Sequence, residues 1–477
     1  MHLSPDFEAL IKQQFDANEA VELLESINSE PSTSVRVNRL KLALAGQSLI
    51  CDNLVKVPWS SSGYYLNKRI KFTYDPCLHA GTYYVQEASS MFVEQALKGL
   101  LSKDVIALDL CAAPGGKSTL LRSIMSDESL LVSNEIVPKR AQILSENIKK
   151  WGHPNCIVTN NAPKDFTQFE SLFDVILTDV PCSGEGMFRK DAVAIQEWSM
   201  SNVAVCKERQ LCIIDDIWPS LKPGGVLVYS TCTFNRQENE DNIAAIIKKY
   251  HAETIRISIK EEWGVVESCT DGEFSYRFLP HKVKGEGLFM AVLRKPSYIG
   301  ESKKCPILYN TKKQSKKGKK ENPRFKKLLQ ECRNWILSPD VFDFKLYNDY
   351  IYAFNLEHMP CLELLQNKKV HILSAGISLA EIKGEKLIPQ QGLAINALLN
   401  RSSFHIEEVS YEQAISYLRK EAITISAMAP KGYVIVSYKN YPLGFIKNLG
   451  NRSNNLYPNE WRIRSSYVTT NTEDYFL

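Results

Sequence analysis

Residues Ala107–Thr119 read ALDLCAAPGGKST, and this stretch decides which fold the chain is expected to adopt. An apolar run ends at Asp109, a Pro-Gly-Gly turn follows, and helix-forming residues begin at Lys117. This order is typical of a buried parallel strand that passes into a helix in a nucleotide-type binding fold. Glycines there let backbone N–H groups approach a ligand at the positive end of the helix. The stretch is neither G-x-G-x-x-G nor a P-loop, and glycine can serve the turn alone, so other residues must decide whether Cys111–Lys117 binds a ligand.

Strands and helices are expected to alternate beyond this loop. The apolar runs with strand character are Leu130–Ser133, Cys156–Thr159, Asp174–Asp179 and Val226–Tyr229. The expected helices are Lys117–Ser126, Gln237–Tyr250 and Asn202–Leu221, the last of which is followed by a Lys-Pro-Gly-Gly stop. Such alternation predicts a parallel sheet covered by helices on both faces, that is, a Rossmann-like α/β fold. We expect this sheet to be complete before Pro296.

Polar and reactive residues follow four of the expected strands. Ligands of parallel sheets bind beyond the carboxyl ends of the strands, and the segments found there are Cys111–Lys117, Glu135, Asp179–Cys182 and Ser230–Thr233. Glu135 lies about 20 residues beyond Gly116, a spacing at which an acidic residue hydrogen-bonds ribose hydroxyls in doubly wound folds. The alternative is an ordinary carboxylate at a helix start, since Pro138 follows closely. Convergence of the four segments predicts a binding site at one rim of the sheet.

Two cysteines lie at this expected rim. Cys182 follows Asp179-Val180-Pro181, and Cys232 lies within Ser-Thr-Cys-Thr. Most of the twelve cysteines are best interpreted as small buried apolar residues, whereas a thiol at a ligand edge can have a lowered pKa and supply thiolate. Addition of a thiolate to carbon 6 of a pyrimidine makes carbon 5 nucleophilic enough to take a methyl group from a sulfonium, after which the carbon 5 proton and the thiolate leave. In this chemistry Asp179 is a candidate for holding the cytosine edge.

These residues resemble the motifs of the Sun/Fmu-type RNA cytosine-5 methyltransferases, a family that uses S-adenosyl-L-methionine. The matching stretches are DLCAAPGGK at Asp109–Lys117, DVPCSGEG at Asp179–Gly186 and STCT at Ser230–Thr233. The family's upstream motif and N-terminal extension are similar to AGTYYVQEASSM at Ala80–Met91 and SVRVNRLK at Ser34–Lys41. The stretch GEGMFRKD, Gly184–Asp191, is similar to the RsmF-like branch, which modifies 16S ribosomal RNA.

The resemblance implies roles for individual residues. Cys232 would be the nucleophile, Cys182 would assist product release, and Asp179 would be the third catalytic residue. Spacing alone does not assign these roles, because DNA cytosine methyltransferases use the Pro-Cys cysteine as the nucleophile. The residues implied to bind the cofactor are Cys111, Ala112, Ala113, Pro114, Gly115, Gly116, Lys117, Glu135 and Asp179.

One segment departs from the family pattern. Many members carry an Asp after the third strand that contacts the adenine side of the cofactor. Here the segment is TNNAPKDF, with Asn160, Asn161 and Ala162 at or near that place and Asp165 further on. The sequence therefore does not say which residue makes this contact.

Size and composition exclude several classes of protein. A chain of 477 residues is expected to form about three domains. It has no apolar run long enough to span a membrane, and the acidic, amphipathic start MHLSPDFEALIKQQF is unlike a signal peptide. Cysteines without close C-x-x-C pairs argue against zinc ribbons and a disulfide framework. We therefore expect a cytoplasmic protein without a metal, which we predict to be a monomer.

Charge is distributed unevenly along the chain. The net charge is +4, but Ser302–Lys327 contains eleven Lys or Arg residues and one acid, Glu321. This segment lacks apolar periodicity and predicts a flexible linker over residues 299–330. It is either a solvated spacer or an electrostatic tether for RNA phosphates, which would make RNA affinity depend on salt.

The C-terminal part is expected to hold two further modules. Phe342–Phe354 and Val370–Leu373 have strand character, and Ala375–Leu399 predicts a turn and then a helix. A hairpin is expected around Asn440–Gly444. Near it, cations alternate with aromatic residues, a composition that suits either RNA binding or the core of a small β-barrel. The cations are Lys447, Arg452, Arg462 and Arg464, and the aromatic residues are Tyr441, Phe445, Tyr457 and Trp461. The stretch PLGFIKNLGNRSNNLYP resembles the PUA-like RNA-binding domain of the RsmF-like branch.

The chain is accordingly divided into five parts. They are an α+β N-terminal extension (1–75), a methyltransferase domain (76–298), the linker (299–330), an α+β module (331–405) and a PUA-like domain (406–477). The resemblance implies methylation of cytidine in 16S ribosomal RNA, free or within the small subunit. The alternatives are the same chemistry on tRNA, and a non-catalytic RNA-binding assembly factor. Retention of all three expected catalytic residues argues against the last of these.

Overall fold

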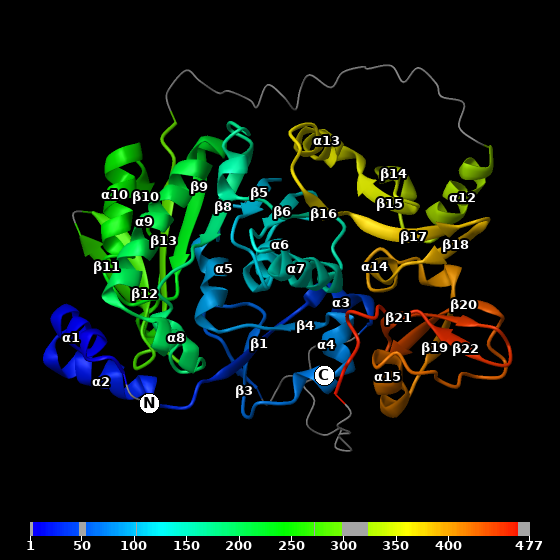
Figure 1. The fold of residues 1–477 in the computed structure, drawn as a ribbon, viewed down its shortest axis with the longest axis horizontal. Coiled ribbons are helices and arrows are strands. Elements are labelled where there is room, and N and C mark those ends of the chain that lie inside the picture. Colours follow the sequence, from blue (N-terminus) through cyan, green and yellow to red (C-terminus); the bar gives the residue numbers. More distant parts are fainter. Residues whose placement is uncertain (1–2, 47–53, 102, 271, 298–322, 466–477) are drawn as a thin grey trace.

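Four β-sheets organise the chain in the computed structural model, which describes residues 3–46, 54–101, 103–270, 272–297 and 323–465. The N-terminal, middle and C-terminal sheets have four strands each, and the central sheet has ten. Figure 1 shows the central sheet with its helices between the N-terminal helices and the C-terminal modules. No helix in these described ranges is both long enough and apolar enough to cross a membrane.

The central sheet contains the parallel core that the sequence predicts. Its strand order is β11-β12-β13-β9-β8-β5-β6-β7-β16, with β10 paired to β13. Five strands are mutually parallel, namely β5 (Ile106–Asp109), β6 (Leu130–Asn134), β7 (Cys156–Thr159), β8 (Phe173–Asp179) and β9 (Leu221–Thr231). The antiparallel strands on the β9 side are β10 (Glu253–Thr254), β11 (Val266–Thr270), β12 (Glu273–Phe278) and β13 (Leu288–Arg294). The expected Rossmann-like α/β fold is therefore confirmed.

Helices cover both faces of this sheet because neighbouring strand residues point to opposite sides. Ala107 packs in one core with residues of α6 (Gly116–Ile124) and α7 (Pro138–Trp151). Leu108 packs in the opposite core with residues of α9 (Met200–Ile217) and α10 (Glu240–Tyr250). The shorter helices around this domain are α5 (Val93–Ala96) and α8 (Ala192–Glu197). The two cores fix β5, and with it the loop at its carboxyl end.

The observed bounds of α9 and α10 differ from the predicted ones. Helix α9 ends at Ile217, and the Lys-Pro-Gly-Gly segment expected after the helix lies inside β9. The pairing of β8 with β9 shifts register between Phe173 and Val175, opposite this segment, so the strand accommodates its Pro and Gly as an irregularity. Helix α10 begins at Glu240 rather than Gln237, because the residues before it form the polar loop described below.

The central sheet is not complete before Pro296, contrary to the expectation from the sequence. Strand β16 (Ile372–Ala375) pairs antiparallel with β7, with Ile372 opposite Thr159. Side chains from residues 354–370 also pack in the core beneath α9 and α10, among them Phe354, Leu362 and Leu365. The sequence could not show this pairing, because a short antiparallel edge strand from a distant segment leaves no periodicity of its own.

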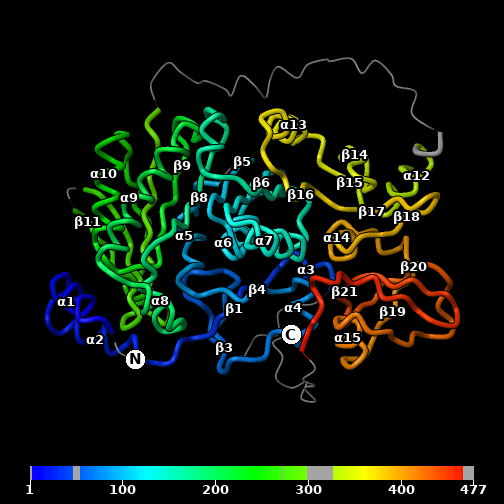
Figure 2. Tube along the Cα trace, in the orientation of Figure 1, coloured from blue at the N-terminus to red at the C-terminus, as the bar shows by residue number. Residues whose placement is uncertain are grey.

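The N-terminal sheet packs against the C-terminal module. It has the order β2-β3-β1-β4, with β1 (Thr33–Val37), β2 (Val55–Lys56), β3 (Gly63–Leu66) and β4 (Tyr83–Val85). The helices of this region are α1 (Pro5–Gln14), α2 (Ala17–Ile27), α3 (Arg39–Leu44) and α4 (Pro76–Ala80). Val35 and Tyr83 of this sheet share a hydrophobic core with Tyr417 and Tyr457 of the C-terminal module. Figure 2 shows these two segments side by side, although they lie at opposite ends of the chain.

The middle module differs from its prediction in one part. The hairpin β14 (Phe342–Tyr347) and β15 (Tyr350–Asn355) occupies the segment expected to have strand character. The expected turn and helix over Ala375–Leu399 is wrong: the segment forms β17 (Ile377–Lys383), β18 (Lys386–Pro389) and only a four-residue helix, α14 (Gln391–Ala394). Gly384, at φ +61°, makes the turn between the strands. The helices of this module are α12 (Pro323–Asn334) and α13 (Met359–Asn367), so the last part of the predicted linker is helical.

The C-terminal module contains the hairpin expected near Asn440. Strands β20 (Gly432–Tyr438) and β21 (Tyr441–Asn448) are joined through Lys439 and Asn440, both of which have positive φ. The sheet is completed by β19 (His405–Glu408) and β22 (Ser453–Asn455), and α15 (Tyr411–Leu418) packs against it. The lysine-rich run 303–320, proposed as a tether, lies outside the described residues.

Candidate active site

The loop Cys111–Lys117 leaves β5 and turns directly into α6. Gly115 has φ +118°, a conformation that L side chains rarely adopt, so glycine is required at this position. Arg140 and Asn147 of α7 donate hydrogen bonds to the carbonyls of Ala113 (2.8 Å) and Pro114 (2.7 Å). These contacts hold the loop carbonyls toward α7, and the amino end of α6 begins at the same place.

A buried arginine from the N-terminal sheet supports the other side of the loop. Arg36 has no solvent-exposed surface, and its guanidinium lies 4.4 Å from the centre of the Trp151 ring. It donates hydrogen bonds to Thr119 Oγ1 (2.6 Å) and the Gly116 carbonyl (3.3 Å), and its Nε donates to Gln86 (2.7 Å). Burial lowers the pKa of Arg36 to about 9. The N-terminal extension therefore contributes directly to the geometry of the loop.

Asp109, at the end of β5, is buried, and only one of its two carboxylate oxygens accepts a hydrogen bond from another described residue. Ser118 donates a 2.6 Å hydrogen bond to Asp109 Oδ2, whereas Oδ1 has no hydrogen-bond partner among the described residues. Burial raises the pKa of Asp109 to about 7, and the Ser118 hydrogen bond only partly opposes this. The site therefore contains a buried, unpaired acceptor directly behind the loop.

Lys117 and Asp179 connect the loop to β8. Lys117 Nζ lies 2.8 Å from Asp179 Oδ2, and Ser230 of β9 donates a 2.9 Å hydrogen bond to Asp179 Oδ1. Burial alone would lower the pKa of Lys117, but the charge and hydrogen bond of Asp179 outweigh it and raise this pKa. The Asp179 side chain keeps 36% of its surface exposed, so its carboxylate is also accessible from the rim.

Glu135 lies at the end of β6 and is almost fully buried. Its Oε1 accepts a 2.9 Å hydrogen bond from the Val137 N–H, as expected of a carboxylate at a helix start. Its Oε2 makes a 3.5 Å ion pair with Arg140, whose side chain is 55% exposed. One oxygen is therefore engaged by the backbone, whereas the other has a long contact that a hydroxyl group can replace.

The segment after β7 that departs from the family pattern is tied to its surroundings. Asn160 donates to the carbonyl of Glu135 (2.7 Å), and Asn161 exchanges two hydrogen bonds with the backbone of His371, just before β16. Asp165 Oδ2 accepts from the Ala162 N–H at 3.0 Å. These side chains fix the loop and dock the middle module onto the sheet.

Cys182 and Cys232 lie together at the carboxyl ends of β8 and β9. Their sulfur atoms are 3.2 Å apart, and the Cys232 N–H also donates to Cys182 Sγ at 3.3 Å. Both are free thiols and partly accessible. The hydrogen bond to Cys232 and burial raise the pKa of Cys182 well above its ordinary value. The arrangement therefore places two thiols in direct contact at the rim.

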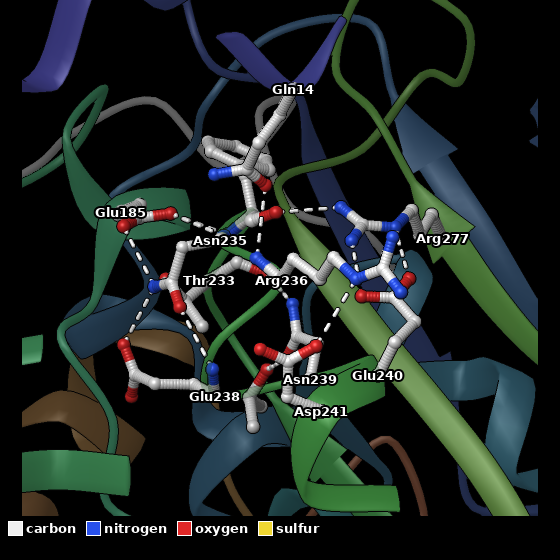
Figure 3. Close-up of polar contacts among 12 residues, drawn as sticks. Gln14, Glu185, Thr233, Asn235, Arg236, Glu238, Asn239, Glu240, Asp241 and Arg277 are labelled. Carbon is white, nitrogen blue, oxygen red and sulfur yellow. Dashed lines mark hydrogen bonds and ion pairs between the residues drawn. The ribbon is translucent and has the colours of Figure 1, made fainter. Parts of the chain in front are cut away.

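A buried polar network surrounds the two cysteine loops and was not recognised from the sequence. Its centre is Asn235, which lies between Glu185 and Glu238 (Figure 3). On the outer side, Arg277 pairs with Glu240 and donates a 2.6 Å hydrogen bond to the Phe234 carbonyl. In the sequence, this network is indicated only by acidic and amide residues in short loops between a strand and a helix.

The predicted aromatic residues of the C-terminal module are mostly core residues. Tyr441, Phe445 and Tyr457 are at most 2% exposed, so they pack inside the module and do not present ring faces to solvent. The expected cations Arg452, Arg462 and Arg464 are exposed. Trp461 is partly exposed and packs edge-on against Tyr457. Composition allowed two interpretations, RNA binding or the core of a small β-barrel, and three of the four aromatic residues fit a core.

The structure thus brings together most of the predicted site. The loop, Asp179, Cys182 and Cys232 meet at one rim through the contacts above, and Glu135 lies at the neighbouring strand end. No group of three or more His, Cys, Asp or Glu side chains is placed to hold a metal ion in the part of the chain that the structure describes. Sequence reasoning missed Arg36 and the Asn235 network.

Comparison with known proteins places this chain in a family. A family model described as 16S rRNA methyltransferase RsmB/F matches residues 99–294. Models described as the N-terminal domain of 16S rRNA methyltransferase RsmF and as the methyltransferase RsmF PUA domain match residues 3–88 and 404–463. A curated relative from Shewanella piezotolerans, named ribosomal RNA small subunit methyltransferase F, is 30% identical over 96% of this chain and 97% of its own length. The chain belongs to the 16S rRNA methyltransferase RsmB/F family. It is an RNA methyltransferase.

Other relatives agree with this membership. The protein of the same name from Shewanella frigidimarina is 30% identical over 90% of this chain and 91% of its own length. Among solved structures, a methyltransferase homolog protein from Pyrococcus horikoshii matches with a TM-score of 0.51 and 26% identity, over 61% of this chain and all of that one. The structure of NSun6 from Pyrococcus horikoshii with SFG has a TM-score of 0.51 and 22% identity, over 62% of this chain and 99% of that one, which shows a common fold. The family models match the central domain and both terminal modules, and the two solved structures match about three fifths of the chain.

Proposed function

We propose that this enzyme transfers a methyl group from S-adenosyl-L-methionine to carbon 5 of a cytidine in small-subunit (16S) ribosomal RNA, through a covalent bond between Cys232 and carbon 6. The observation that carries this proposal is the pair of thiols, 3.2 Å apart, at the strand ends beside Asp179. The substrate class rests on the family description and on the names of the relatives. The same chemistry on tRNA is the close alternative.

The residues at the rim fit the cofactor. Cys111–Lys117 would hold it at the amino end of α6, where backbone N–H groups and the unpaired Asp109 Oδ1 offer polar contacts. Glu135 Oε2 would accept from the ribose hydroxyls in place of its long contact to Arg140. When bound, S-adenosyl-L-methionine supplies a methyl group on a positively charged sulfur.

Cys232 begins the proposed reaction as a thiolate. Its sulfur would form a bond to carbon 6, and the ring electrons would move to carbon 5. Carbon 5 would then take the methyl group while the bond from that methyl to the sulfonium sulfur breaks, which leaves a neutral thioether. A base takes the carbon 5 proton, the electrons of that C–H bond restore the ring double bond, and the carbon–sulfur bond breaks. Asp179 would hold the polar edge of the cytosine, since its carboxylate is partly exposed and fixed by Lys117 and Ser230.

Cys182 is assigned to breakdown of the covalent adduct. Its raised pKa keeps it a protonated thiol at neutral pH, and a thiol is a poor nucleophile compared with a thiolate. Lying 3.2 Å from Cys232, it can donate a proton to the departing sulfur. In this proposal the nucleophile is Cys232, as the family resemblance implies, and the target base must leave its stack to reach the sulfur.

The test is a denaturing gel of two variants with RNA and S-adenosyl-L-methionine. Cys232→Ala leaves no thiolate to attack carbon 6, so methylation and covalent RNA attachment should both vanish. Cys182→Ala should still form the bond but release product slowly, so a protein–RNA species should accumulate. A covalent band from Cys232→Ala alone would reverse the two assignments.

The RNA substrate is tested separately by bisulfite sequencing of ribosomal RNA from a strain that lacks this protein. We expect one or more 5-methylcytosines to disappear from the small-subunit RNA. Retention of all of them would contradict the ribosomal substrate and favour tRNA. A non-catalytic assembly factor is disfavoured because Cys232, Cys182 and Asp179 are all present and adjacent.

Three further features belong to the same proposal. We propose that the enzyme works in the cytoplasm as a monomer. We propose the five-part division drawn from the sequence, at residues 75, 298, 330 and 405, except that β4 belongs to the sheet of the N-terminal part and α12 crosses the boundary at 330. The C-terminal module and the lysine-rich segment would supply affinity for RNA, while the central domain supplies the chemistry.

A further inference from the structure

Cys182 and Cys232 lie in two separate loops. Each loop contains a glutamate whose carboxylate accepts hydrogen bonds from backbone N–H groups of the other loop. Glu185, three residues after Cys182, accepts hydrogen bonds from the backbone N–H groups of Phe234 (2.6 Å) and Asn235 (2.9 Å), just after Cys232. In return, Glu238 accepts from the Ser183 N–H at 3.1 Å. Figure 3 shows Glu185 and Glu238 on the two sides of Asn235. The contacts are reciprocal, so neither loop can move without breaking hydrogen bonds of the other.

Asn235 joins these two carboxylates to each other. Its side-chain amide nitrogen lies 2.9 Å from Glu185 Oε1 and 2.7 Å from Glu238 Oε1. Its side-chain oxygen accepts from the Glu238 N–H at 2.9 Å. A direct backbone hydrogen bond from the Gly186 N–H to the Cys232 carbonyl, 2.8 Å long, lies alongside. The loops are thus connected through one amide and two acids.

The network requires carboxylates rather than amides. Every hydrogen bond that the structure gives the carboxylate oxygens of Glu185 and Glu238 comes from an N–H or O–H donor. These donors include Trp198 Nε1 (3.0 Å) on Glu185 and Gln210 Nε2 (2.7 Å) on Glu238. A glutamine would place its NH₂ group against N–H donors on one side. Both side chains are buried, so such a mismatch cannot be relieved by water at the surface.

Buried carboxylates are costly, and here two of them lie between the loops that carry the cysteines. Glu238 also contributes to the raised pKa of Cys182. Apolar residues would fill the same space without the cost of removing a charge from water. A fully satisfied polar network, however, fixes one arrangement of its members, whereas apolar packing tolerates several. Fixing the relative position of the two cysteine loops is what this network does.

We propose that Glu185, Asn235 and Glu238 are positioning residues that hold Cys182 and Cys232 within proton-transfer distance of each other. The effect of these residues on catalysis rests on the proposed roles of the two cysteines. Their effect on the distance between the two thiols does not, because that distance can be tested without RNA. None of the three side chains needs to touch the RNA or the cofactor.

The experiment uses phenylarsine oxide on the full-length protein. This reagent exchanges its oxygen, released as water, for bonds from arsenic to two neighbouring thiol sulfurs, without oxidation or reduction of either. Binding is followed by protection of the peptides that contain Cys182 and Cys232 from alkylation, read by mass spectrometry. We expect protection in the wild-type protein and its loss in Cys182→Ser.

The deciding variants are Glu185→Gln and Glu238→Gln. Each should weaken arsenical binding to the pair by about tenfold or more, because an unsatisfied buried donor loosens one loop. The turnover number for RNA methylation should fall by a similar factor, while the Kd for S-adenosyl-L-methionine stays within about twofold. Glu240→Gln is the matched control. It removes the same charge at the first residue of α10, on the outer side of the Cys232 loop, where the Glu240 carboxylate pairs with Arg277.

The outcomes separate the two proposals. Unchanged arsenical binding in both glutamine variants would overturn the positioning role, and so would an equal loss in Glu240→Gln. If the wild-type protein methylates no RNA, the proposed function fails while the thiol measurement still decides the positioning role. If the glutamine variants do not bind S-adenosyl-L-methionine, Asn235→Ser decides instead with the same readouts, since it removes only the amide that joins the two acids.

Discussion

At the scale of single residues, the site is organised by pairs that link one strand end to the next. Lys117 after β5 pairs with Asp179 of β8, and Ser230 of β9 fixes the other oxygen of that carboxylate. Asp109 makes no such ion pair with another described residue, and burial raises its pKa to about 7. The proposed cofactor loop and the proposed catalytic carboxylate therefore cannot shift independently.

For single residues, the testable prediction concerns the contact of Glu135 with the cofactor. In Glu135→Ala the cofactor loses charge-assisted hydrogen bonds to its ribose, each worth about 1.5–3 kcal/mol. Titration calorimetry should show the affinity for S-adenosyl-L-methionine weakened at least about tenfold. The Val137 N–H also loses its acceptor, so a small drop in thermal stability is expected as well.

Glu146→Ala is the control for this prediction. Glu146 lies on the same helix as Arg140 and pairs with Lys150, whereas the loop carbonyls accept hydrogen bonds from Arg140 and Asn147. Its replacement removes the same charge and should leave cofactor affinity unchanged. Equal dissociation constants for the wild type and Glu135→Ala would remove Glu135 from the proposed site.

At the scale of elements, the rim is formed by strand ends, and the edge of the sheet is formed by a distant segment. The parallel register places Asp179 opposite Ser230 and Asp109 opposite Ser133, so the proposed site residues follow from the pairing. Strand β16 then covers the edge of β7 and brings the middle module with it. Because β16 covers this edge, we expect a chain that ends before β16 to be less stable.

A chain that ends at Pro296 should be less stable than the full-length protein. It loses β16 and the buried side chains Phe354, Leu362 and Leu365, each of which contributes about 1.5–3 kcal/mol when buried. We expect a lower thermal midpoint and aggregation through the uncovered edge of β7. The control is a chain that ends at Ser465, which keeps every described element. Equal midpoints for the two shortened chains would show that the middle module adds nothing to the central sheet.

Local patterns predicted the elements whose neighbours lie close in sequence. Apolar runs and the Pro-Gly-Gly turn predicted β5 to β9, because a buried parallel strand must be apolar along its length. Ala375–Leu399 was misjudged because its alternating residues form a hairpin, β17 and β18, that only pairing with β15 makes evident. The Asn235 network escaped for a similar reason: its acids and amides acquire their partners only when two loops 50 residues apart meet.

At the scale of the whole molecule, the two ends of the chain form one structural unit. The shared core of the N-terminal sheet and the C-terminal module includes Val35, Tyr83, Tyr417 and Tyr457. Lys150, at the end of α7, lies 5.2 Å from the centre of the Trp461 ring, so the C-terminal module also contacts the central domain. RNA held by this module would therefore be held at a fixed position relative to the rim.

The exposed cations of the C-terminal module provide the prediction for RNA affinity. Because its aromatic residues Tyr441, Phe445 and Tyr457 are buried, affinity should come from charge on phosphates rather than from base stacking. Replacing Arg452, Arg462 and Arg464 together by Gln should weaken RNA binding. It should also flatten the dependence of log K on log salt by about 0.7–0.9 for each phosphate that the protein no longer neutralises.

The measurement is RNA binding at several salt concentrations, with a control that carries the same change of charge. The control replaces Lys98, Lys103 and Lys248 by Gln, three exposed lysines outside the C-terminal module. Both variants lose three positive charges, so a general effect of net charge would flatten both slopes equally, which would contradict a local site. Cofactor affinity should be unchanged in both, because none of these side chains touches the loop. A slope that falls only in the arginine variant would assign the phosphate contacts to the C-terminal module.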